Sequence, residues 1–370
     1  MSDQYLDKIV VNRGNQKRLK NVMLRARSGE KVTIGYLGGS ITRGSVATTP
    51  EKCYAYLSCQ WWNETFPQAE VVYCNAGIGA TTSQFGVARA DEDLLYTKPD
   101  LVFIEFSVND DNVPHFQETY EGLVRHVYTA ESLPAVVLLH NSFFDDGRSA
   151  EEIHTAVGRY YDLPCVSIKN NMYARIAAGE LAAETITSDY LHPNDAGHAM
   201  LADTIKAFLD RVYAEVDSPE TEPVFPAQPL TRNRYEHSRR LRNQQMAADT
   251  CQGFTEDHTP QSDMTDIFKC GWEAWEEGAF MDFTMTGSTL AVQYRRTINK
   301  PAPAARVIVD GDEEKAVLLD GEFDETWGDL IALTTIFEEE EAAEHHVRIQ
   351  VCRTHEMDAS GFYLVSVITA

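Results

Sequence analysis

The sequence predicts a parallel α/β domain followed by an antiparallel β domain. Over roughly the first two hundred residues, short β-branched and apolar runs alternate with amphipathic segments of helical period. Residues 217–229 are rich in proline and acidic side chains and cannot continue a helix. Beyond them, short and partly alternating runs separated by Gly, Pro and acidic turns predict strands. We therefore divide the chain into residues 1–216, a linker at 217–229, and residues 230–370.

The elements of the first domain follow one another in regular alternation. The apolar runs predict strands at residues 32–37, 71–77, 100–107, 134–140 and 164–168. The helical patterns cover residues 16–28, 53–66, 120–130, 150–163 and 194–216, and a further helix contains Phe85 and Val87. Strands and helices that alternate at this spacing imply right-handed crossovers and a parallel sheet covered on both faces.

The second domain is expected to be an antiparallel β-sandwich of jelly-roll type. Segments such as STLAVQYRR, ARVIVDG, HHVRIQV and GFYLVSVITA have the length and the punctuation of short strands. Residues 230–268 show no clear pattern and stay unassigned. The acidic run at residues 338–344 is expected to be a solvated turn.

Composition limits the partners of the chain. Its 57 acidic and 32 basic residues give a formal charge of −25, which repels phosphate backbones and anionic lipid, so neither nucleic acid nor a membrane is expected to bind. The first residues become polar and basic without an apolar core, which predicts a cytoplasmic protein. The 7 scattered cysteines lack C-x-x-C spacing and favour neither a disulfide framework nor a zinc site. We expect no metal or cofactor.

Reactive groups follow several of the predicted strands. Ligands of open α/β sheets bind beyond the carboxyl ends of the strands, so residues that directly follow the strands converge on one edge. The side chains and glycines at these positions, or on the loop before the last helix, are Ser40, Gly77, Gly79, Asn109, Asp189 and His192. We therefore expect one site at this edge of the sheet.

This set of groups is chemically complete for acyl transfer. A serine hydroxyl needs a base, which His192 would provide for Ser40, and Asp189 would hold the imidazole in one tautomer. The oxyanion needs donors, which a glycine turn, the N–H of Ser40 and the amide of Asn109 would provide. Glycines beside the serine would let substrate approach the backbone.

Other interpretations remain for the same residues. Ser40 alone could cap the next helix, or the glycine-rich turn could bind phosphate or flavin in a non-catalytic protein. That interpretation assigns no function to Asn109, Asp189 or His192. Asp110 and Asp111 could suggest a cation, but adjacent acids on a loop are expected to be solvated. His198 is expected to be structural.

Four segments together resemble the SGNH, or GDSL-type, hydrolase family: GGSIT, NAGIGATTS, SVND and DYLHPNDAGH. Their order and spacing match that family over roughly residues 18–212. The resemblance implies a flavodoxin-like three-layer α/β/α fold. It also implies a nucleophile, an oxyanion hole completed by a glycine and an asparagine, and an acid and base, which fall on Ser40, Gly79, Asn109, Asp189 and His192.

The sequence departs from the family pattern at two positions. Gly39 stands where the GDSL signature has aspartate, and Ser107 replaces a glycine, which resembles a GGSIT-type subgroup. The glycine of the second block is either Gly77 or Gly79. We prefer Gly79 because it directly precedes the ATTS segment.

The resemblance implies a serine esterase that works through an acyl-enzyme on Ser40. No lid-like apolar helix is evident, which favours a short, acetyl-sized acyl group. The C-terminal half is similar to jelly-roll domains attached to SGNH carbohydrate deacetylases, so O-acetyl groups on a sugar or oligosaccharide are the expected substrate. A lipase or thioesterase is the alternative within the family. An oligomer of identical chains is compatible with this sequence.

Overall fold

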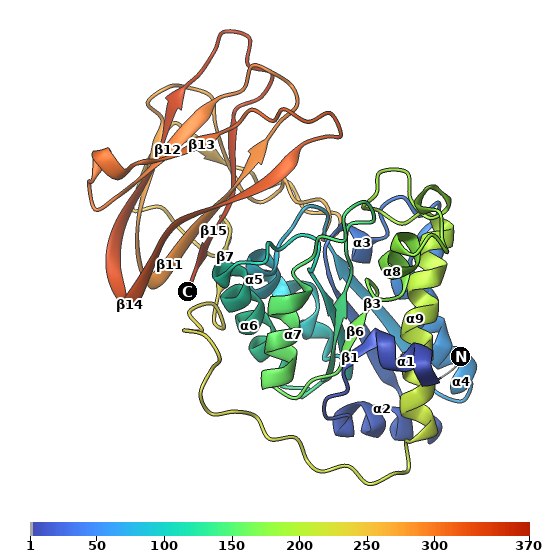
Figure 1. The fold of residues 1–370 in the computed structure, drawn as a ribbon. Coiled ribbons are helices and arrows are strands. Elements are labelled where there is room, and N and C mark those ends of the chain that lie inside the picture. The colour runs from blue at the N-terminus through green and yellow to red at the C-terminus, as the bar shows by residue number, and fades with distance from the viewer. Residues whose placement is uncertain (1–2) are drawn as a thin grey trace. The chain divides into compact units, whose positions relative to one another are not determined.

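The computed structural model describes residues 3–370, which form two compact units divided between Glu236 and His237 (Figure 1). Each unit has its own hydrophobic core. Among residues 3–370, no helix has the length and apolar character needed to cross a bilayer.

The first unit is built on a six-stranded sheet in the order β1-β6-β5-β4-β2-β3. All neighbours are parallel except β1 and β6, which are antiparallel. The strands are β1 (Val10–Asn12), β2 (Val32–Gly38), β3 (Val71–Gly77), β4 (Leu101–Glu105), β5 (Ala135–His140) and β6 (Cys165–Ser167). Every residue of β2, β4 and β5 is buried, as their continuous apolar runs predict.

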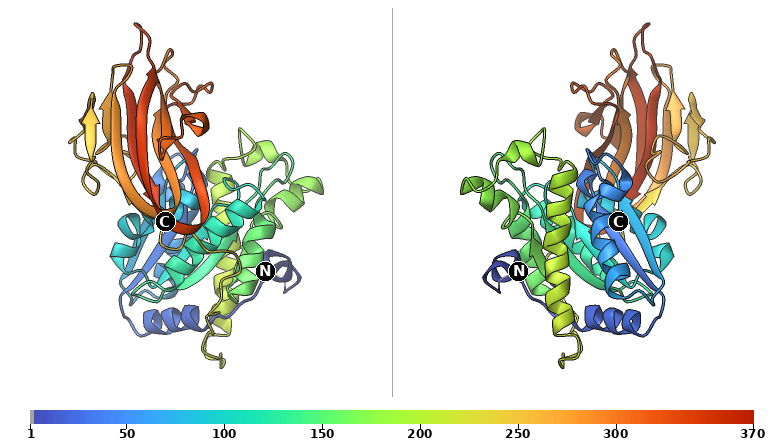
Figure 2. Two further views of the ribbon diagram at one scale, coloured as in Figure 1. Left: turned by 90° about the vertical axis from the view of Figure 1, so that its left-hand side faces the viewer. Right: turned by 90° about the vertical axis from the view of Figure 1, so that its right-hand side faces the viewer.

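Helices cover both faces of this sheet (Figure 2). The helices are α1 (Asp3–Ile9), α2 (Lys17–Arg27), α3 (Ser40–Arg43), α4 (Tyr54–Thr65), α5 (Ser83–Asp93), α6 (Pro114–Tyr128), α7 (Glu151–Tyr160), α8 (Met172–Ala177) and α9 (Asp195–Ala214). Short 3₁₀ turns lie at η1 (Pro50–Lys52), η2 (Leu95–Thr97) and η3 (Ala183–Thr185). The predicted three-layer α/β/α class is confirmed.

One helix begins earlier than its sequence pattern indicates. The pattern predicts a helix at residues 120–130, whereas α6 begins at Pro114. Proline suits the first helical position because that N–H has no partner within the helix. The short elements α1, β1 and α8 were not predicted, since three to seven residues hold too few repeats to show a period.

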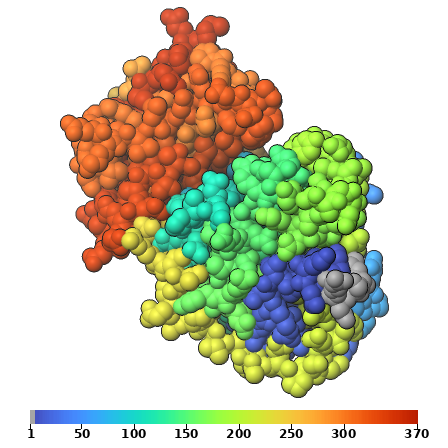
Figure 3. Space-filling view, viewed as in Figure 1, coloured from blue at the N-terminus to red at the C-terminus, as the bar shows by residue number. Residues whose placement is uncertain are grey.

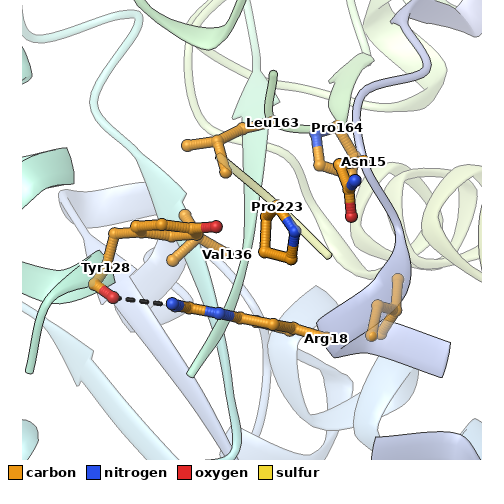
Figure 4. Close-up of a pocket in the computed structure, with 9 residues that line it drawn as sticks. Asn15, Arg18, Tyr128, Val136, Leu163, Pro164 and Pro223 are labelled. Atoms are coloured by element: carbon orange, nitrogen blue, oxygen red, sulfur yellow. Dashed lines mark hydrogen bonds between the residues drawn. The ribbon is translucent and has the colours of Figure 1, made fainter. Parts of the chain in front are cut away.

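The segment expected to be a linker packs on the first unit (Figure 3). Glu220 accepts hydrogen bonds from Lys20 and Arg13 at 2.8 and 2.9 Å. Pro223 lines a small pocket with Arg18 and Tyr128, where the Arg18 guanidinium lies 3.8 Å from the centre of the Tyr128 ring (Figure 4). Residues 217–229 are therefore attached to the surface of this unit.

Glu121 of α6 holds the residues that follow this segment against the first unit. Its side chain is buried and accepts the backbone N–H groups of Leu230 and Thr231, each at 2.6 Å. Arg234 and Glu118 form a further ion pair at 2.7 Å. The compact unit consequently extends to Glu236.

The second unit is an antiparallel nine-stranded sheet in the order β13-β12-β14-β11-β15-β10-β9, with β7 beside β15 and β8 beside β11. The elements are β7 (Arg239–Leu241), β8 (Thr250–Gln252), β9 (Phe254–Glu256), β10 (Trp272–Ala274), β11 (Phe280–Arg296), β12 (Ala304–Val309), η4 (Glu313–Lys315), β13 (Val317–Asp320), β14 (Leu330–Arg353) and β15 (Phe362–Thr369). The antiparallel class is confirmed, and jelly-roll topology stays a prediction. The unassigned residues 230–268 hold β7, β8 and β9.

The acidic run at residues 338–344 lies inside β14 rather than in a separate turn. Thr289 pairs with Glu338 and Gly287 pairs with Ala343, so the intervening residues form an irregularity in the ladder. Residues 339–344 are exposed, as expected for a solvated segment. The prediction of solvation is confirmed, whereas the prediction of a turn is wrong.

Candidate active site

The register of three neighbouring strands brings the predicted site residues together. Gly38 at the end of β2 pairs with Gly77 of β3 on one side and with Glu105 of β4 on the other. The loops that follow therefore leave the sheet at the same level. Ser40 begins α3 directly after β2, and Gly79 and Asn109 lie on the loops after β3 and β4, all at the carboxyl edge that the sequence predicts.

The glycines before Ser40 allow close packing within the protein. A Cβ atom on Gly39 would lie 2.2 Å from Oδ1 of Asn109, and one on Gly38 would lie 2.2 Å from Oγ1 of Thr42. Ser40 is the first residue of α3, which ends at Arg43 and is followed by Gly44 in the left-handed conformation with φ 93°. The expectation that these glycines serve substrate access is therefore incomplete, because the Asn109 side chain fills the space beside Gly39.

His192 connects Ser40 to Asp189. Its Nε2 lies 2.8 Å from Oγ of Ser40, and its Nδ1 lies 2.7 Å from Oδ2 of Asp189. With Nδ1–H donating to the carboxylate, Nε2 is left as an acceptor for the Ser40 hydroxyl proton. Ser40 is 7% exposed, whereas the side chains of His192 and Asp189 are 22% and 45% exposed. The site is therefore accessible from solvent on its acid–base side.

Backbone donors hold the Asp189 carboxylate as well. Its Oδ1 accepts the N–H groups of His192 at 2.7 Å and of Leu191 at 3.0 Å. Partial burial would raise the pKa of this carboxyl, but the hydrogen bonds from the His192 side chain and from the two N–H groups outweigh it and lower the pKa. Asp189 is consequently ionised at neutral pH and can stabilise a positive charge on His192.

The turn that carries this pair is strained at Tyr190. Its φ of 60° lies in the left-handed region, which disfavours residues with a Cβ atom. The carbonyl of Tyr190 accepts the N–H of Phe144 at 2.7 Å, and Thr187 pairs with Pro193 in a β-bridge. These contacts hold the turn that carries Asp189 and His192.

The two candidate glycines have different surroundings. A Cβ atom on Gly77 would lie 2.2 Å from the backbone N of Arg43, and the N–H of Gly77 already donates to Oδ1 of Asn75 at 2.9 Å. A Cβ atom on Gly79 would lie 3.8 Å from Cβ of Ser40 and 4.0 Å from Nη1 of Arg43. Gly77 therefore packs tightly against α3, whereas a Cβ atom on Gly79 would fit in ordinary van der Waals contact with Ser40.

A second set of contacts joins the segment after α3 to α9. Asp195 accepts the N–H and the hydroxyl of Thr48 at 2.8 and 2.7 Å. His198 is buried between the N–H of Tyr54 at 3.3 Å and the carbonyl of Ser45 at 3.4 Å, and burial lowers its pKa to about 4. The structural role expected for His198 agrees with these contacts.

Asp110 differs from its expected state. It is 4% exposed, so the expectation that both adjacent acids are solvated is wrong for Asp110 and right for Asp111. Its carboxylate is bonded to Ser83 and His154, which lie far away in the sequence. No pattern along the chain connects these residues, so only the tertiary structure reveals them. Among the described residues, no cluster of His, Cys, Asp or Glu could hold a metal ion.

A parallel α/β unit with serine, histidine and aspartate hydrogen-bonded in line at its carboxyl edge has the architecture of a serine hydrolase. Residues 36–200 match the GDSL-like lipase/acylhydrolase family. Together with 51% identity over 98% of the chain to a two-domain esterase, this match shows that the chain belongs to the SGNH esterase family and is a carboxylic ester hydrolase.

Similar proteins are known at two levels of identity. A two-domain esterase active on acetylated mannans, crystallised with mannopentaose, is 51% identical, with 98% of this chain and 97% of the other covered and a TM-score of 0.95. A second crystal structure with the same description gives 51% identity and a TM-score of 0.96. An acetylxylan esterase from Geobacillus stearothermophilus is 25% identical over 217 residues, which is 51% of this chain and 96% of that protein.

Proposed function

We propose that this chain removes acetyl groups from mannan-type oligosaccharides through an acyl-enzyme on Ser40. The observation that carries the proposal is the position of His192, whose two ring nitrogens lie 2.8 Å from the Ser40 hydroxyl and 2.7 Å from the Asp189 carboxylate. The substrate class is supported by the 51% identical esterase, which acts on acetylated mannans.

In the first half of the reaction, Oγ of Ser40 attacks the ester carbonyl carbon while Nε2 of His192 takes the hydroxyl proton. The tetrahedral intermediate carries its negative charge on the former carbonyl oxygen. The C–O bond to the sugar then breaks, and His192 returns the proton to the departing sugar hydroxyl. The acetyl group remains bound to Ser40 as an ester.

In the second half, water attacks the acetyl-serine and His192 again accepts the proton. A second tetrahedral intermediate collapses, Ser40 recovers its proton from His192, and acetic acid leaves. Asp189 keeps the Nδ1–H tautomer in place and stabilises the imidazolium formed in each half-reaction.

We assign the oxyanion hole to the N–H groups of Ser40 and Gly79 and to the side-chain amide of Asn109. The contacts of Gly77 support this choice, since its N–H is bonded to Asn75 and its Cα lies against α3. Removing one such donor typically costs about 3 kcal/mol of transition-state stabilisation.

We further propose that the reaction takes place in the cytoplasm on imported oligosaccharides. All seven cysteines are free thiols, and Cys53, Cys59, Cys165 and Cys270 are buried, which suits a reducing compartment. The location is tested by fractionating the native cells and assaying mannan-acetate release in each fraction. Activity confined to the medium would contradict it.

Replacing the nucleophile tests the mechanism. We expect Ser40→Ala to lower kcat on p-nitrophenyl acetate by roughly 10³-fold or more, because the substitution removes the hydroxyl that forms the acyl-enzyme in the proposed mechanism. Ser132→Ala is the matched control. Ser132 lies just before β5, away from the carboxyl edge, and its hydroxyl donates to the carbonyl of Pro99. An active Ser40→Ala variant would contradict the serine mechanism.

A substrate panel tests the specificity separately. Acetate release is measured from acetylated mannooligosaccharides and acetylated xylooligosaccharides, beside nitrophenyl esters of short and long acids. We expect the acetylated mannooligosaccharides to be hydrolysed with the highest kcat/KM. Preference for long-chain esters would instead indicate a lipase or thioesterase.

A further inference from the structure

Asp110 is a buried carboxylate that the hydrolytic steps above do not use. It directly follows Asn109, and only 4% of its surface is exposed. Burial raises its pKa to about 7, although hydrogen bonds from Ser83 oppose the shift. Enclosing such a group costs free energy unless its oxygens are hydrogen-bonded, so its partners indicate its task.

The first partner lies on the other loop of the proposed oxyanion hole. Oδ1 of Asp110 accepts the backbone N–H of Ser83 at 2.9 Å, and Ser83 is the first residue of α5. Between Gly79 and Ser83, the chain passes through Ala80 at φ 56°, in the left-handed region. A loop in this conformation requires contacts from outside to keep its shape.

The second partner fixes the carboxylate from α7. Oδ2 of Asp110 lies 3.1 Å from Nε2 of His154, and both side chains are fully enclosed. Burial lowers the pKa of His154 to about 3, so its ring is neutral. Its Nδ1 has no hydrogen-bond partner among the described residues, which places the ring proton on Nε2, where it donates to Asp110.

The His154 ring is itself held in place. It stacks on Tyr120 of α6 with ring centres 3.5 Å apart and planes inclined by 6°. Asp110 is thus hydrogen-bonded to the first residue of α5 and to the ring of His154, which belongs to α7 and stacks on α6. A shift of Asp110 would therefore displace the adjacent Asn109 and the loop of residues 79–82, here called the Gly79 loop.

We propose that Asp110 is a positioning residue that holds Asn109 and the Gly79 loop at the separation needed for both to donate to one oxyanion. The inference rests on the proposed function, because it assumes that these two residues form the oxyanion hole. The charge on that oxygen is largest in the tetrahedral intermediate, so a change in spacing weakens the transition state more than it weakens ester binding.

Two substitutions of Asp110 separate its hydrogen bonds from its charge. Asp110→Ala removes both bonds, and we expect kcat on p-nitrophenyl acetate to fall roughly 30- to 100-fold, with KM changed by less than about threefold. Asp110→Asn keeps the shape, accepts from Ser83, and donates to His154 once its ring proton moves to Nδ1. We expect this variant to retain about a third of the wild-type kcat or more.

The partner on α5 allows an independent test. Ser83→Pro removes the N–H that donates to Asp110. Proline suits this position, because Ser83 is the first residue of α5 and the preceding Thr82 has the extended backbone that a residue before proline prefers. Ser83→Ala keeps the N–H and loses only the hydroxyl that pairs with Thr119 at 2.6 Å. We expect Ser83→Pro to lose kcat as Asp110→Ala does, and Ser83→Ala to stay close to the wild type.

A boronic acid distinguishes positioning from general destabilisation. Methylboronic acid adds to the serine hydroxyl as a tetrahedral adduct with an oxygen at the oxyanion position, so its Ki should rise in Asp110→Ala in parallel with the loss of kcat. Glu121→Ala is the control, since it removes a buried carboxylate whose partners are Leu230, Thr231 and Tyr161. It should lower the melting temperature while kcat and Ki stay unchanged.

Several results would overturn the proposal. One is a folded Asp110→Ala variant with kcat within about threefold of the wild type. Another is a loss of kcat in Asp110→Ala without a rise in the Ki of methylboronic acid. A third is an Asp110→Asn variant as impaired as Asp110→Ala. If Asp110→Ala does not fold, the comparison of Ser83→Pro with Ser83→Ala decides instead. Failure of the proposed function is distinct, because Ser40→Ala would then remain active.

Discussion

At the scale of single residues, packing limits decide which positions near Ser40 can vary. Gly38 and Gly39 stand where a Cβ atom would collide with Thr42 and Asn109. These glycines let α3 and the Asn109 side chain approach the end of β2. The placement of Ser40 thus depends on the absence of side chains as much as on its own hydroxyl group.

The two glycines after β3 should respond differently to substitution. In Gly77→Ala, the new Cβ atom would lie 2.2 Å from the backbone of Arg43, so α3 must shift and carry Ser40 with it. We expect a loss of about 2–4 kcal/mol in the free energy of unfolding, together with a lower kcat. In Gly79→Ala, the nearest atoms are 3.8 Å away, so the stability should change by less than about 0.5 kcal/mol.

Urea unfolding and p-nitrophenyl acetate kinetics on both variants test this pair. For Gly79→Ala we expect a several-fold lower kcat/KM, because the added methyl group projects beside Ser40. A stable, fully active Gly77→Ala enzyme would disprove the structural role of Gly77.

At the scale of elements, the amphipathic and continuous apolar segments follow their predicted forms. The strands β2, β3, β5 and the helices α2, α4, α9 begin and end within a few residues of the expected positions. The region after α9 is different, because its proline and acidic residues suggest an unattached linker. One contact that attaches it is the ion pair of Glu220 with Lys20, a buried residue with only 3% of its side chain exposed.

The Glu220 attachment predicts a specific pH dependence of stability. Hydrogen bonds from Arg13, opposed by burial, and a further bond from Lys20 lower the pKa of this carboxyl from 4.5 to about 2. The folded state therefore binds this proton more weakly than the unfolded state. The stabilisation is complete above pH 4.5 and is lost as the pH falls towards 2.

Glu220→Gln should lower the free energy of unfolding by about 2 kcal/mol at pH 7, because it leaves the Lys20 ammonium buried without a counter-charge. The difference from the wild type should shrink as the pH approaches 2. Urea unfolding at a series of pH values measures both effects. Glu222→Gln is the control, since that side chain is 81% exposed and lies 3.8 Å from Lys17. Equal effects of the two substitutions would contradict the prediction.

At the scale of the whole molecule, each unit has a separate core. The core of the first unit is centred on the parallel sheet, and that of the second on the long strands β11 and β14. The proposed catalytic groups all lie before Glu236. This separation predicts that the first unit folds and hydrolyses simple esters without the second.

Two shortened chains test this expectation. A chain ending at Glu236 keeps the bonds of Glu121 to Leu230 and Thr231, so we expect one cooperative unfolding transition and near wild-type kcat on p-nitrophenyl acetate. A chain ending at Val216 loses these bonds and the Glu220 pairs, and should unfold at a lower temperature. An inactive or unfolded chain ending at Glu236 would show that the second unit is required.

The fold class, the ester hydrolase family and the set of candidate site residues can all be read from the amino-acid sequence. Such features are written locally, because the period of a helix, the apolar run of a buried strand and a short block such as GGSIT each occupy consecutive positions. A parallel sheet then implies that blocks at strand ends meet at one edge.

The contacts that support these residues become visible only in the folded protein. The close approach of α3 to Gly77 distinguishes the role of Gly77 from that of Gly79. Asp110 is buried and hydrogen-bonded to Ser83 and His154. Residues after α9 are hydrogen-bonded to α6. Each is a contact between positions remote in the sequence. Burial and hydrogen-bond partners depend on which elements pack together, and no periodic pattern in a single chain records that.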